Sequence, residues 1–317
     1  MTDQLVTLRE ISRAREVIAG RLHRTPTASS SYLSKQCGAN VTLKLELFQK
    51  TGSFKPRGVL NALTSLEKAA RERGVISLSA GNHAQALAWG ATSLGIRSTI
   101  VMPQSAQRSK LEATRGYGGE VVLTEGDLLE TCLSIQRERG LTLIHPFDDR
   151  RVIAGQGTVG LELLEDVPNV DLVLVACGGG GLLSGVAAAV KLTRPSARVI
   201  GVEPEGASAM SQSVQKGEPV RLTKLDTIAD GLAAPFAGRL NLAHVQAFVD
   251  AMLIVSDREI IAALGTLLER CKVVPEPAGA AALAPLLTGE LKIDSGINVA
   301  VIICGGNIDR ERLKSLL

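Results

Sequence analysis

The chain has 317 residues, enough for about two domains, and its composition argues against several classes of protein. Hydrophobic residues make up 45% and charged residues 21%, as in an ordinary α/β protein. The formal net charge is only +3 and aromatic residues make up 3%. The chain therefore lacks the excess of basic residues and the aromatic side chains for base stacking that are typical of nucleic-acid-binding proteins. We therefore expect it to bind no nucleic acid.

The cysteines and the first residues indicate the compartment. The five cysteines form no C-x-x-C pair, which argues against a disulfide framework or a zinc site and favours a reducing environment. The N-terminus has acidic residues where a signal peptide would have an apolar core, and no run of about 18 apolar residues exists. We expect a cytoplasmic protein without a membrane span. Because the chain stops at Leu317, soon after its last predicted strand, we also expect no appended regulatory domain.

Short apolar runs alternate with helical patterns along the chain. The predicted strands are residues 41–45, 75–78, 98–102, 120–123, 141–144, 171–176, 197–202 and 298–304. The clearest helical patterns cover residues 83–94, 127–139, 183–191 and 257–271. Several strands are continuously apolar, as strands covered on both faces should be, and strand–helix–strand repeats predict parallel sheets with crossovers. The sequence thus predicts an α/β fold with two doubly wound, parallel-sheet domains.

The spacing of the strands predicts where the two domains divide. Four strand–helix units follow one another between residues 75 and 147, and the polar, proline-bearing stretch 146–151 suits a crossing between domains. We predict a large domain made of residues 1–72 and 148–317, with a small domain of residues 73–147 inserted in it.

Lys55 lies in the unusual segment Thr51-Gly52-Ser53-Phe54-Lys55-Pro56-Arg57-Gly58. Pro56 disfavours a helical conformation at Lys55 and is itself suited to the start of a following helix, so we expect Lys55 at a fixed elbow. A solvated lysine at a helix entrance is the alternative. Two glycine-rich segments elsewhere favour a chemical role.

The first of these segments, Ser79-Ala80-Gly81-Asn82-His83, ends a predicted strand and opens a helix. Free N–H groups at such a helix start, together with the Ser79 hydroxyl, would bind a carboxylate. An ordinary helix cap by Asn82 is the alternative.

The second segment is a run of four glycines that follows the predicted strand 171–176 and precedes a helix. Backbone N–H groups at such a turn form an anion site suited to a phosphate, and glycines let the backbone approach the oxygens closely. Neither G-x-G-x-x-G nor the Gly-Lys-Ser/Thr of a P-loop is present, because Leu183 takes the sixth position counted from Gly178. A purely structural turn is the alternative.

Cys304 closes the last predicted strand and is followed by two glycines and an asparagine. A buried cysteine is most often just a small apolar residue, but the carboxyl end of a strand is where α/β proteins bind ligands. His145, also at a strand end, is as suited to packing as to catalysis.

Together these segments resemble the threonine/serine dehydratase and serine racemase family of fold-type II pyridoxal-phosphate enzymes. The resemblance covers about residues 10–312 and is strongest in residues 47–58, 79–86, 152–158, 177–182 and 227–231. It implies two domains with the cofactor, pyridoxal 5'-phosphate, in the cleft between them, and we expect a homodimer.

The resemblance also implies a role for each site residue. Lys55 forms the Schiff base with the cofactor and later removes the Cα proton, while the loop of Ser79, Ala80, Gly81, Asn82 and His83 binds the substrate. The remaining cofactor contacts that it implies are Phe54 beside the ring, Asn82 at the phenolic oxygen, Cys304 at the ring nitrogen, a loop containing Gly231, and the phosphate loop Gly178, Gly179, Gly180, Gly181 and Leu182.

Two departures from the racemases of this group bear on function. They carry a serine where this chain has Ala80, opposite the lysine, and acidic metal ligands where this chain keeps Glu203 but has Ala209. We therefore expect no metal, with Glu203 as a weak candidate ligand.

The expected function is an ammonia-lyase that converts a β-hydroxy-α-amino acid such as L-threonine or L-serine to a 2-oxo acid and ammonia. One alternative is a serine racemase-like enzyme, and another is a dehydratase for a bulkier or acidic substrate such as phenylserine or hydroxyaspartate. A non-catalytic binder of amino acids or nucleotides is the alternative from a different class.

Overall fold

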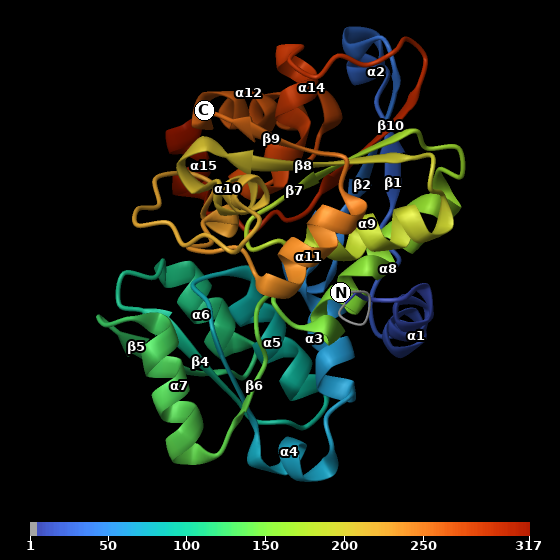
Figure 1. The fold of residues 1–317 in the computed structure, drawn as a ribbon. Helices are drawn as coiled ribbons and strands as arrows, with labels where there is room; N and C mark the ends of the chain where they lie inside the picture. The colour runs from blue at the N-terminus through green and yellow to red at the C-terminus, as the bar shows by residue number, and fades with distance from the viewer. Residues whose placement is uncertain (1–4) are drawn as a thin grey trace.

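The computed structural model describes residues 5–317 and contains two β-sheets surrounded by helices (Figure 1). One sheet has six strands in the order β1-β2-β10-β7-β8-β9, and the other has four in the order β5-β4-β3-β6. The strands are β1 (Thr27–Ser29), β2 (Asn40–Leu45), β3 (Val75–Leu78), β4 (Ser98–Pro103), β5 (Glu120–Thr124), β6 (Thr142–Leu143), β7 (Leu172–Ala176), β8 (Arg198–Pro204), β9 (Ala251–Val255) and β10 (Asn298–Ile303). The six-stranded sheet occupies the upper half of Figure 1 and the four-stranded sheet the lower half.

Most of the α-helices lie between successive strands, whereas α1 precedes β1 and α15 follows β10. They are α1 (Leu8–Ile18), α2 (Ser31–Cys37), α3 (Lys55–Thr64), α4 (Lys68–Arg73), α5 (Asn82–Ser93), α6 (Arg108–Gly116), α7 (Leu128–Arg139), α8 (Arg150–Asp166), α9 (Gly181–Thr193), α10 (Ala209–Lys216), α11 (Arg239–Phe248), α12 (Asp257–Thr266), α13 (Pro277–Ala280), α14 (Ala284–Thr288) and α15 (Arg310–Leu316). Among the described residues, no helix combines the length and the apolar character that a bilayer span requires.

The predicted parallel α/β architecture is confirmed. Every strand pair in both sheets is parallel except β1 with β2, which is antiparallel. In β10, at the middle of the larger sheet, Val299 to Ile303 are all buried, which explains the unbroken apolar run in the sequence. The carboxyl ends of these parallel strands bring the loops after β7 and β10 to one edge of the sheet.

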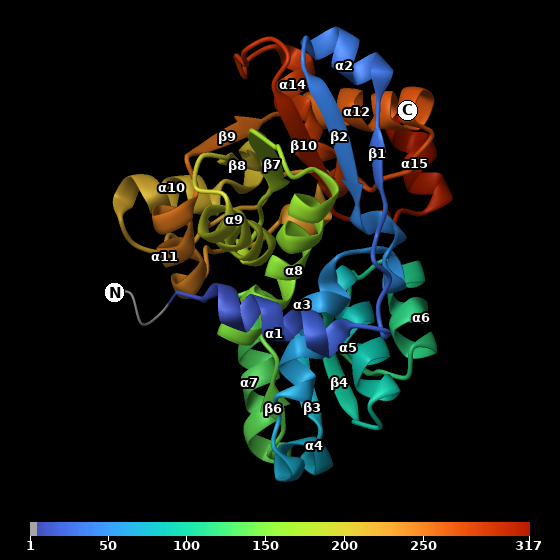
Figure 2. The ribbon, with the colours of Figure 1, turned by 90° about the vertical axis from the view of Figure 1, so that its right-hand side faces the viewer.

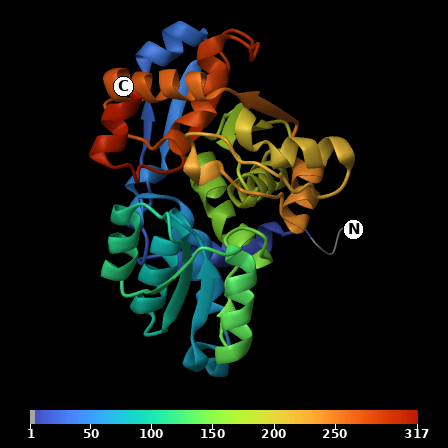
Figure 3. The ribbon, with the colours of Figure 1, turned by 90° about the vertical axis from the view of Figure 1, so that its left-hand side faces the viewer.

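The four-stranded sheet is covered on both faces (Figure 3). Val101 packs with Cys132 of α7 on one face, whereas its neighbour Ile100 packs with Leu87 of α5 on the other. This alternation is what a strand buried between two helical layers requires. All four strands fall inside the predicted residues 73–147, although the division into domains stays a prediction.

Helix α3 lies where the two sheets meet, because it packs against α8 on one side and α5 on the other. Helix α1 runs across the same region and packs on α8 and α3 (Figure 2). Lys55, the first residue of α3, is therefore placed between the two sheets.

Three local expectations differ from the structure. Lys55 lies inside the first turn of α3, so the prediction that Pro56 would hold it outside the helix is wrong. Proline is tolerated in a first turn because its missing N–H would have no partner there. The helix predicted over 257–271 is present, but only Asp257–Thr266 is α-helical, and Leu267–Cys271 continue it as a π-helix. Two edge strands, β1 and β9, were not predicted.

Candidate active site

Lys55 is held in place by the loop after β10. The Phe54 N–H donates to the Cys304 carbonyl at 3.1 Å, and the Gly306 N–H donates to the Gly52 carbonyl at 2.9 Å. Before Lys55 the backbone turns through Thr51, whose φ of 60° is unusual for a β-branched residue. The surrounding hydrogen bonds impose this conformation, so Lys55 follows a turn of defined shape.

The Lys55 amine points to the segment that joins the two sheets. Its Nζ donates to the Pro146 carbonyl at 3.0 Å. Desolvation lowers the pKa of Lys55 to about 8, although the nearby Cys304 and Glu276 act in the opposite direction. A lysine with such a pKa has an appreciable neutral fraction near neutral pH and can act as a nucleophile or base.

A buried charge network fixes helix α3 behind Lys55. The Arg57 guanidinium makes paired hydrogen bonds to two carboxylates, Glu46 at 2.7 and 2.8 Å and Glu162 at 2.7 and 2.8 Å. Lys44 Nζ donates to the same Glu162 carboxylate at 2.8 Å. Arg57 and Glu46 are completely buried. We call Lys44, Glu46, Arg57 and Glu162 the Arg57 network. It accounts for the arginine in the Lys55 segment.

The glycine run forms a cradle that side chains would fill. A Cβ at Gly179 would lie 2.5 Å from the Phe147 ring, and one at Gly180 would lie 2.5 Å from Met210 Cε. Gly180 also has a φ of +98°, which glycine alone adopts readily. Helix α9 begins at the next residue, so its first N–H groups have no partner within the helix and suit a bound anion.

The loop before α5 faces the loop after β10. The amide of Asn82 donates from Nδ2 to Glu276 at 2.5 Å and accepts at Oδ1 from Asn307 at 2.8 Å. Asn82 makes no capping bond and the N-cap position is Gly81, so the alternative of an ordinary cap is wrong. The Ser79 hydroxyl accepts from the Gly81 N–H at 3.1 Å, which leaves its own proton available to a ligand.

His83, the last residue of that loop, is buried and does not titrate near neutral pH. Burial lowers the pKa of His83 well below its usual value. Its Nε2 lies 3.0 Å from the Ser77 hydroxyl, which already donates to the Ile144 carbonyl at 2.6 Å. Nε2 must therefore be the donor, and this fixes the tautomer.

Cys304 and Glu276 are buried beside Lys55 and Asn82. Burial raises the pKa of the Cys304 thiol, which donates to the Ala278 carbonyl at 3.4 Å. Burial also raises the pKa of Glu276 to about 7, while the Asn82 hydrogen bond works against this shift. Gly305 follows Cys304. A Cβ at this position would collide with the Glu276 carboxylate, so glycine leaves the space that the carboxylate needs.

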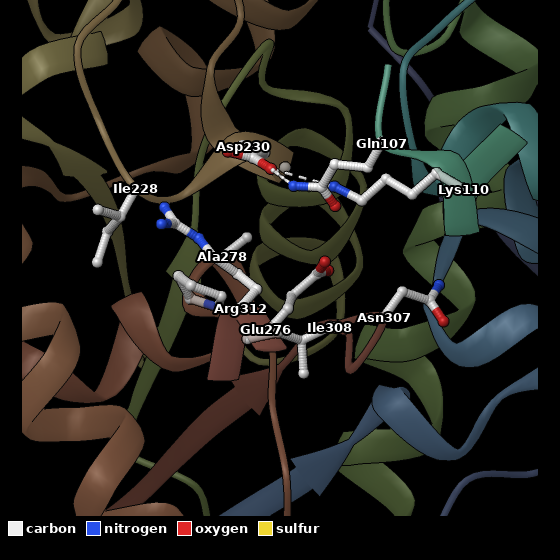
Figure 4. Close-up of a pocket in the computed structure, with 11 residues that line it drawn as sticks. Gln107, Lys110, Ile228, Asp230, Glu276, Ala278, Asn307, Ile308 and Arg312 are labelled. Atoms are coloured by element: carbon white, nitrogen blue, oxygen red, sulfur yellow. Dashed lines mark hydrogen bonds and ion pairs between the residues drawn. The ribbon is translucent and has the colours of Figure 1, made fainter. Parts of the chain in front are cut away.

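A small cavity of about 20 Å³ opens next to Glu276, between α6 and the loops of the six-stranded sheet. Figure 4 shows Lys110 and Gln107 reaching toward Asp230, with Lys110 Nζ at 3.1 Å and Gln107 Nε2 at 3.3 Å from the carboxylate. Gly231 also lines the cavity. The structure thus places Gly231, which the sequence analysis assigned to a cofactor-binding loop, beside Asn82 and Glu276.

Sequence reasoning missed several side chains of this site. It gave the Glu276 carboxylate no task, and it assigned none to Asn307 or Lys110. Asn307 had a usable signal, since it follows two glycines at the end of β10. Lys110, in the middle of a polar helix, had none.

Glu203, the weak metal candidate, is occupied by backbone donors. Its carboxylate accepts from the N–H groups of Met210 at 2.8 Å and Ser211 at 2.7 Å, at the start of α10. Burial raises its pKa to about 7. Within residues 5–317 no group of three or more His, Cys, Asp or Glu residues is arranged to hold a metal ion.

Comparison with known proteins decides the family. The sequence model described as "Pyridoxal-phosphate dependent enzyme" matches residues 18–305. The chain belongs to this family. An L-threonine ammonia-lyase of Thermotoga maritima is 45% identical over 318 residues, which cover 99% of this chain and 78% of the relative. A catabolic L-threonine dehydratase of Staphylococcus aureus is 41% identical over 322 residues, covering 100% and 93%. Maize serine racemase has a similar structure, with a TM-score of 0.94 and 39% identity over 98% of this chain and 96% of its own.

These similarities confirm the fold-type II threonine/serine dehydratase group and pyridoxal phosphate as the cofactor. The site has the features that this cofactor needs. The glycine cradle with its unpaired helix N–H groups suits the phosphate, and Lys55 supplies an amine with a lowered pKa.

Proposed function

We propose that this protein is a pyridoxal-phosphate dependent ammonia-lyase that converts L-threonine, L-serine or a related β-hydroxy-α-amino acid to a 2-oxo acid and ammonia. The observation that carries the proposal is the position of the Lys55 amine. It bonds to the Pro146 carbonyl, and the next residue, Phe147, packs its ring on the glycine cradle. The amine and the phosphate cradle therefore face the same space, as a cofactor bound at both ends requires.

In this proposal Lys55 both anchors the cofactor and moves the proton. When bound, pyridoxal phosphate supplies the electron sink that makes the substrate's Cα–H acidic. The Lys55 Nζ takes that proton, and its pKa of about 8 keeps part of the amine neutral for this task. Phe54 packs against the large core beside Lys55 and would flank the ring of the bound cofactor.

Polar groups at the edge of the site orient cofactor and substrate. Asn82 Nδ2 would hold the phenolic oxygen, and Glu276 and Asn307 already fix its amide on both sides. The substrate carboxylate would meet the N–H groups of residues 80–83 and the hydroxyl of Ser79, at the start of α5. Gly231 lines the same cavity, and a Cβ there would lie 3.7 Å from Glu276 Oε1 and 4.0 Å from Asn82 Nδ2.

Cys304 would meet the ring nitrogen of the bound cofactor, and this would favour elimination. Because burial raises the pKa of this thiol, it stays neutral and cannot keep the ring nitrogen protonated as a carboxylate would. Negative charge at Cα is then poorly stabilised, so prompt loss of a β-leaving group is favoured over transamination.

Product analysis tests the reaction. Purified enzyme is incubated with L-threonine, L-serine, phenylserine and hydroxyaspartate, and the 2-oxo acid and ammonia are measured together. Equal amounts of both products from at least one substrate are expected. If none of the four substrates yields a 2-oxo acid together with ammonia, the proposal is contradicted. The same panel decides which side chain the cavity accepts at Cβ.

Racemisation is the second candidate, because the structurally similar maize protein is a serine racemase. Ala80 argues against it here, since alanine has no exchangeable proton to deliver to the face opposite Lys55. With L-serine, wild-type enzyme should form pyruvate much faster than D-serine. Ala80→Ser should raise D-serine formation by roughly 10²-fold, the contribution of a positioned acid. Chiral chromatography measures both, and wild-type D-serine formation as fast as pyruvate formation would make the racemase the better assignment.

The remaining proposals concern assembly and location. We propose a cytoplasmic homodimer in which residues 73–147 move as a small domain over the substrate. Exposed apolar side chains support the dimer: Tyr32 is 43%, Phe48 50% and Val274 42% exposed. Sedimentation of the purified protein at twice the chain mass is the expected result.

A further inference from the structure

Asn241, in the first turn of α11, connects the glycine cradle to the segment that contacts Lys55. The residue is completely buried. Its Nδ2 donates to two backbone carbonyls, Phe147 at 3.1 Å and Gly179 at 3.0 Å. Both amide hydrogens are therefore used, and the amide can face only one way.

These bonds determine the orientation of the peptide between Gly179 and Gly180. The Gly179 carbonyl accepts from Asn241 Nδ2 and also, at 3.3 Å, from the Gly238 N–H, so it points toward α11. In a trans peptide the following N–H points the opposite way. The Gly180 N–H is thus directed away from α11, toward the side on which the α9 N-terminus is open.

A peptide between two glycines needs such an anchor. Glycine adopts both signs of φ with similar ease, so this peptide unit can rotate at little cost when nothing holds it. Rotation would replace the Gly180 N–H donor with the Gly179 carbonyl, whose negative end repels an anion. The loop lies directly on the helix, because a Cβ at Gly180 would be 2.8 Å from Asn241 Cβ.

Asn241 is not needed to attach α11 to the Lys55 side of the site. The Asp148 carboxylate already accepts from the N–H groups of Arg239 at 3.1 Å and Leu240 at 2.9 Å, at the start of the helix. The amide of Asn241 is therefore available for a task that Asp148 does not perform, and of the two bonds to the Gly179 carbonyl it makes the shorter, 3.0 Å against 3.3 Å from the Gly238 N–H.

We propose that Asn241 is a positioning residue for the cofactor phosphate: it holds the Gly179–Gly180 peptide so that the Gly180 N–H faces the phosphate oxygens. The inference rests on the proposed function in one respect, the assignment of the glycine run as the phosphate loop. Asn241 touches no reacting atom. It acts through the orientation of one backbone donor.

The test compares two ligands that differ only in the phosphate. Full-length enzyme is freed of cofactor, and its dissociation constants for pyridoxal phosphate and for pyridoxal are measured by equilibrium dialysis. In Asn241→Ala the preference for pyridoxal phosphate over pyridoxal should fall about 10- to 100-fold, the effect of one hydrogen bond to a charged group. Affinity for pyridoxal itself should change little.

Asn298→Ala is the matched control. Its side chain also donates to a backbone carbonyl, Asn169 at 3.1 Å, but at the amino end of β10, away from the site. The ligand preference should be unchanged in this variant. If Asn241→Ala does not fold, Asn241→Ser keeps one donor, and we expect a smaller fall in the same preference.

The outcomes distinguish failure of the Asn241 inference from failure of the phosphate-loop assignment. An unchanged preference in the Asn241 variant, equal weakening of both ligands, or the same change in Asn298→Ala would overturn the inference. Wild-type enzyme that binds pyridoxal as tightly as pyridoxal phosphate would instead overturn the phosphate loop of the proposed function.

Discussion

Two polar clusters flank Lys55, and they are built in opposite ways. The Arg57 network lies behind α3, where Arg57 and Glu46 are fully buried and every charge has an opposite partner. The contacts across the cavity join α6 and the loop before α5 to the loops of the six-stranded sheet, and Asp230 there is half exposed. The first cluster fixes the helix that carries Lys55. The second includes a half-exposed ion pair, which stabilises much less than a buried one, as the proposed movement of residues 73–147 over a substrate requires.

Removing Arg57 should have the largest effect on stability. Arg57→Met leaves the Glu46 and Glu162 carboxylates buried with fewer donors, and breaking such a pair costs about 3–5 kcal/mol. Urea unfolding measures this loss. Arg150→Met is the matched control, because its paired bonds to Glu10 lie in a site where the two side chains are 34% and 37% exposed, so a loss of at most about 1 kcal/mol is expected. Equal losses in the two variants would remove the distinction between the clusters.

Glu276 should make the protein less stable as the pH rises. Its folded pKa of about 7 lies above the ordinary 4.5, so the folded state binds the extra proton between these values. Stability is then lost as the pH rises from about 4.5 through 7, by on the order of 3 kcal/mol at most. The free energy of unfolding of Glu276→Gln, measured by urea unfolding across this pH range, should lack the loss that Glu276 causes.

Glu162 should show the opposite slope. Desolvation raises the pKa of this carboxyl, but Arg57 and Lys44 together outweigh it and lower the folded pKa, so its contribution is present above the ordinary pKa and is lost as the pH falls. Glu162→Gln should therefore flatten the acid side of the stability profile while Glu276→Gln flattens the neutral side. Slopes of the same sign in both variants would contradict the comparison.

The Lys110–Asp230 pair should have the smallest effect. Lys110→Met removes one ion pair whose carboxylate is half exposed, so the stability loss should be below about 1 kcal/mol and should shrink further in high salt. Urea unfolding at low and high ionic strength measures both. A loss comparable to that of Arg57→Met would mean that the cavity contacts are as fixed as the Arg57 network.

The sequence predicted most of the fold because the core strands are continuously apolar. The edge strands were harder. β1 has only three residues of mixed character, and β9 exposes Ile254 to 44%, so neither reads as a fully buried strand. Pro56 by itself predicts that Lys55 lies outside the helix, but loop contacts that the sequence does not show hold Lys55 in the first turn.

The candidate site likewise contains residues that the sequence predicts and residues that it does not. Lys55, Asn82, the glycine run and Cys304 lie at strand ends or in glycine loops, where sequence patterns carry information. Arg57 was visible only as part of a motif, and its partners Glu46 and Glu162 come from distant elements that only folding brings together. Asn241 lies in a helix with no distinguishing pattern, so its two carbonyl partners could not be inferred.

The central claim is that Lys55 alone anchors the cofactor, and mapping the anchor tests it most directly. Holoenzyme is reduced with borohydride, digested, and searched by mass spectrometry for the lysine that carries the reduced cofactor. The account predicts the adduct on Lys55 only, and no adduct and no turnover in Lys55→Ala. An adduct on any other lysine, or an active Lys55→Ala enzyme, would contradict it.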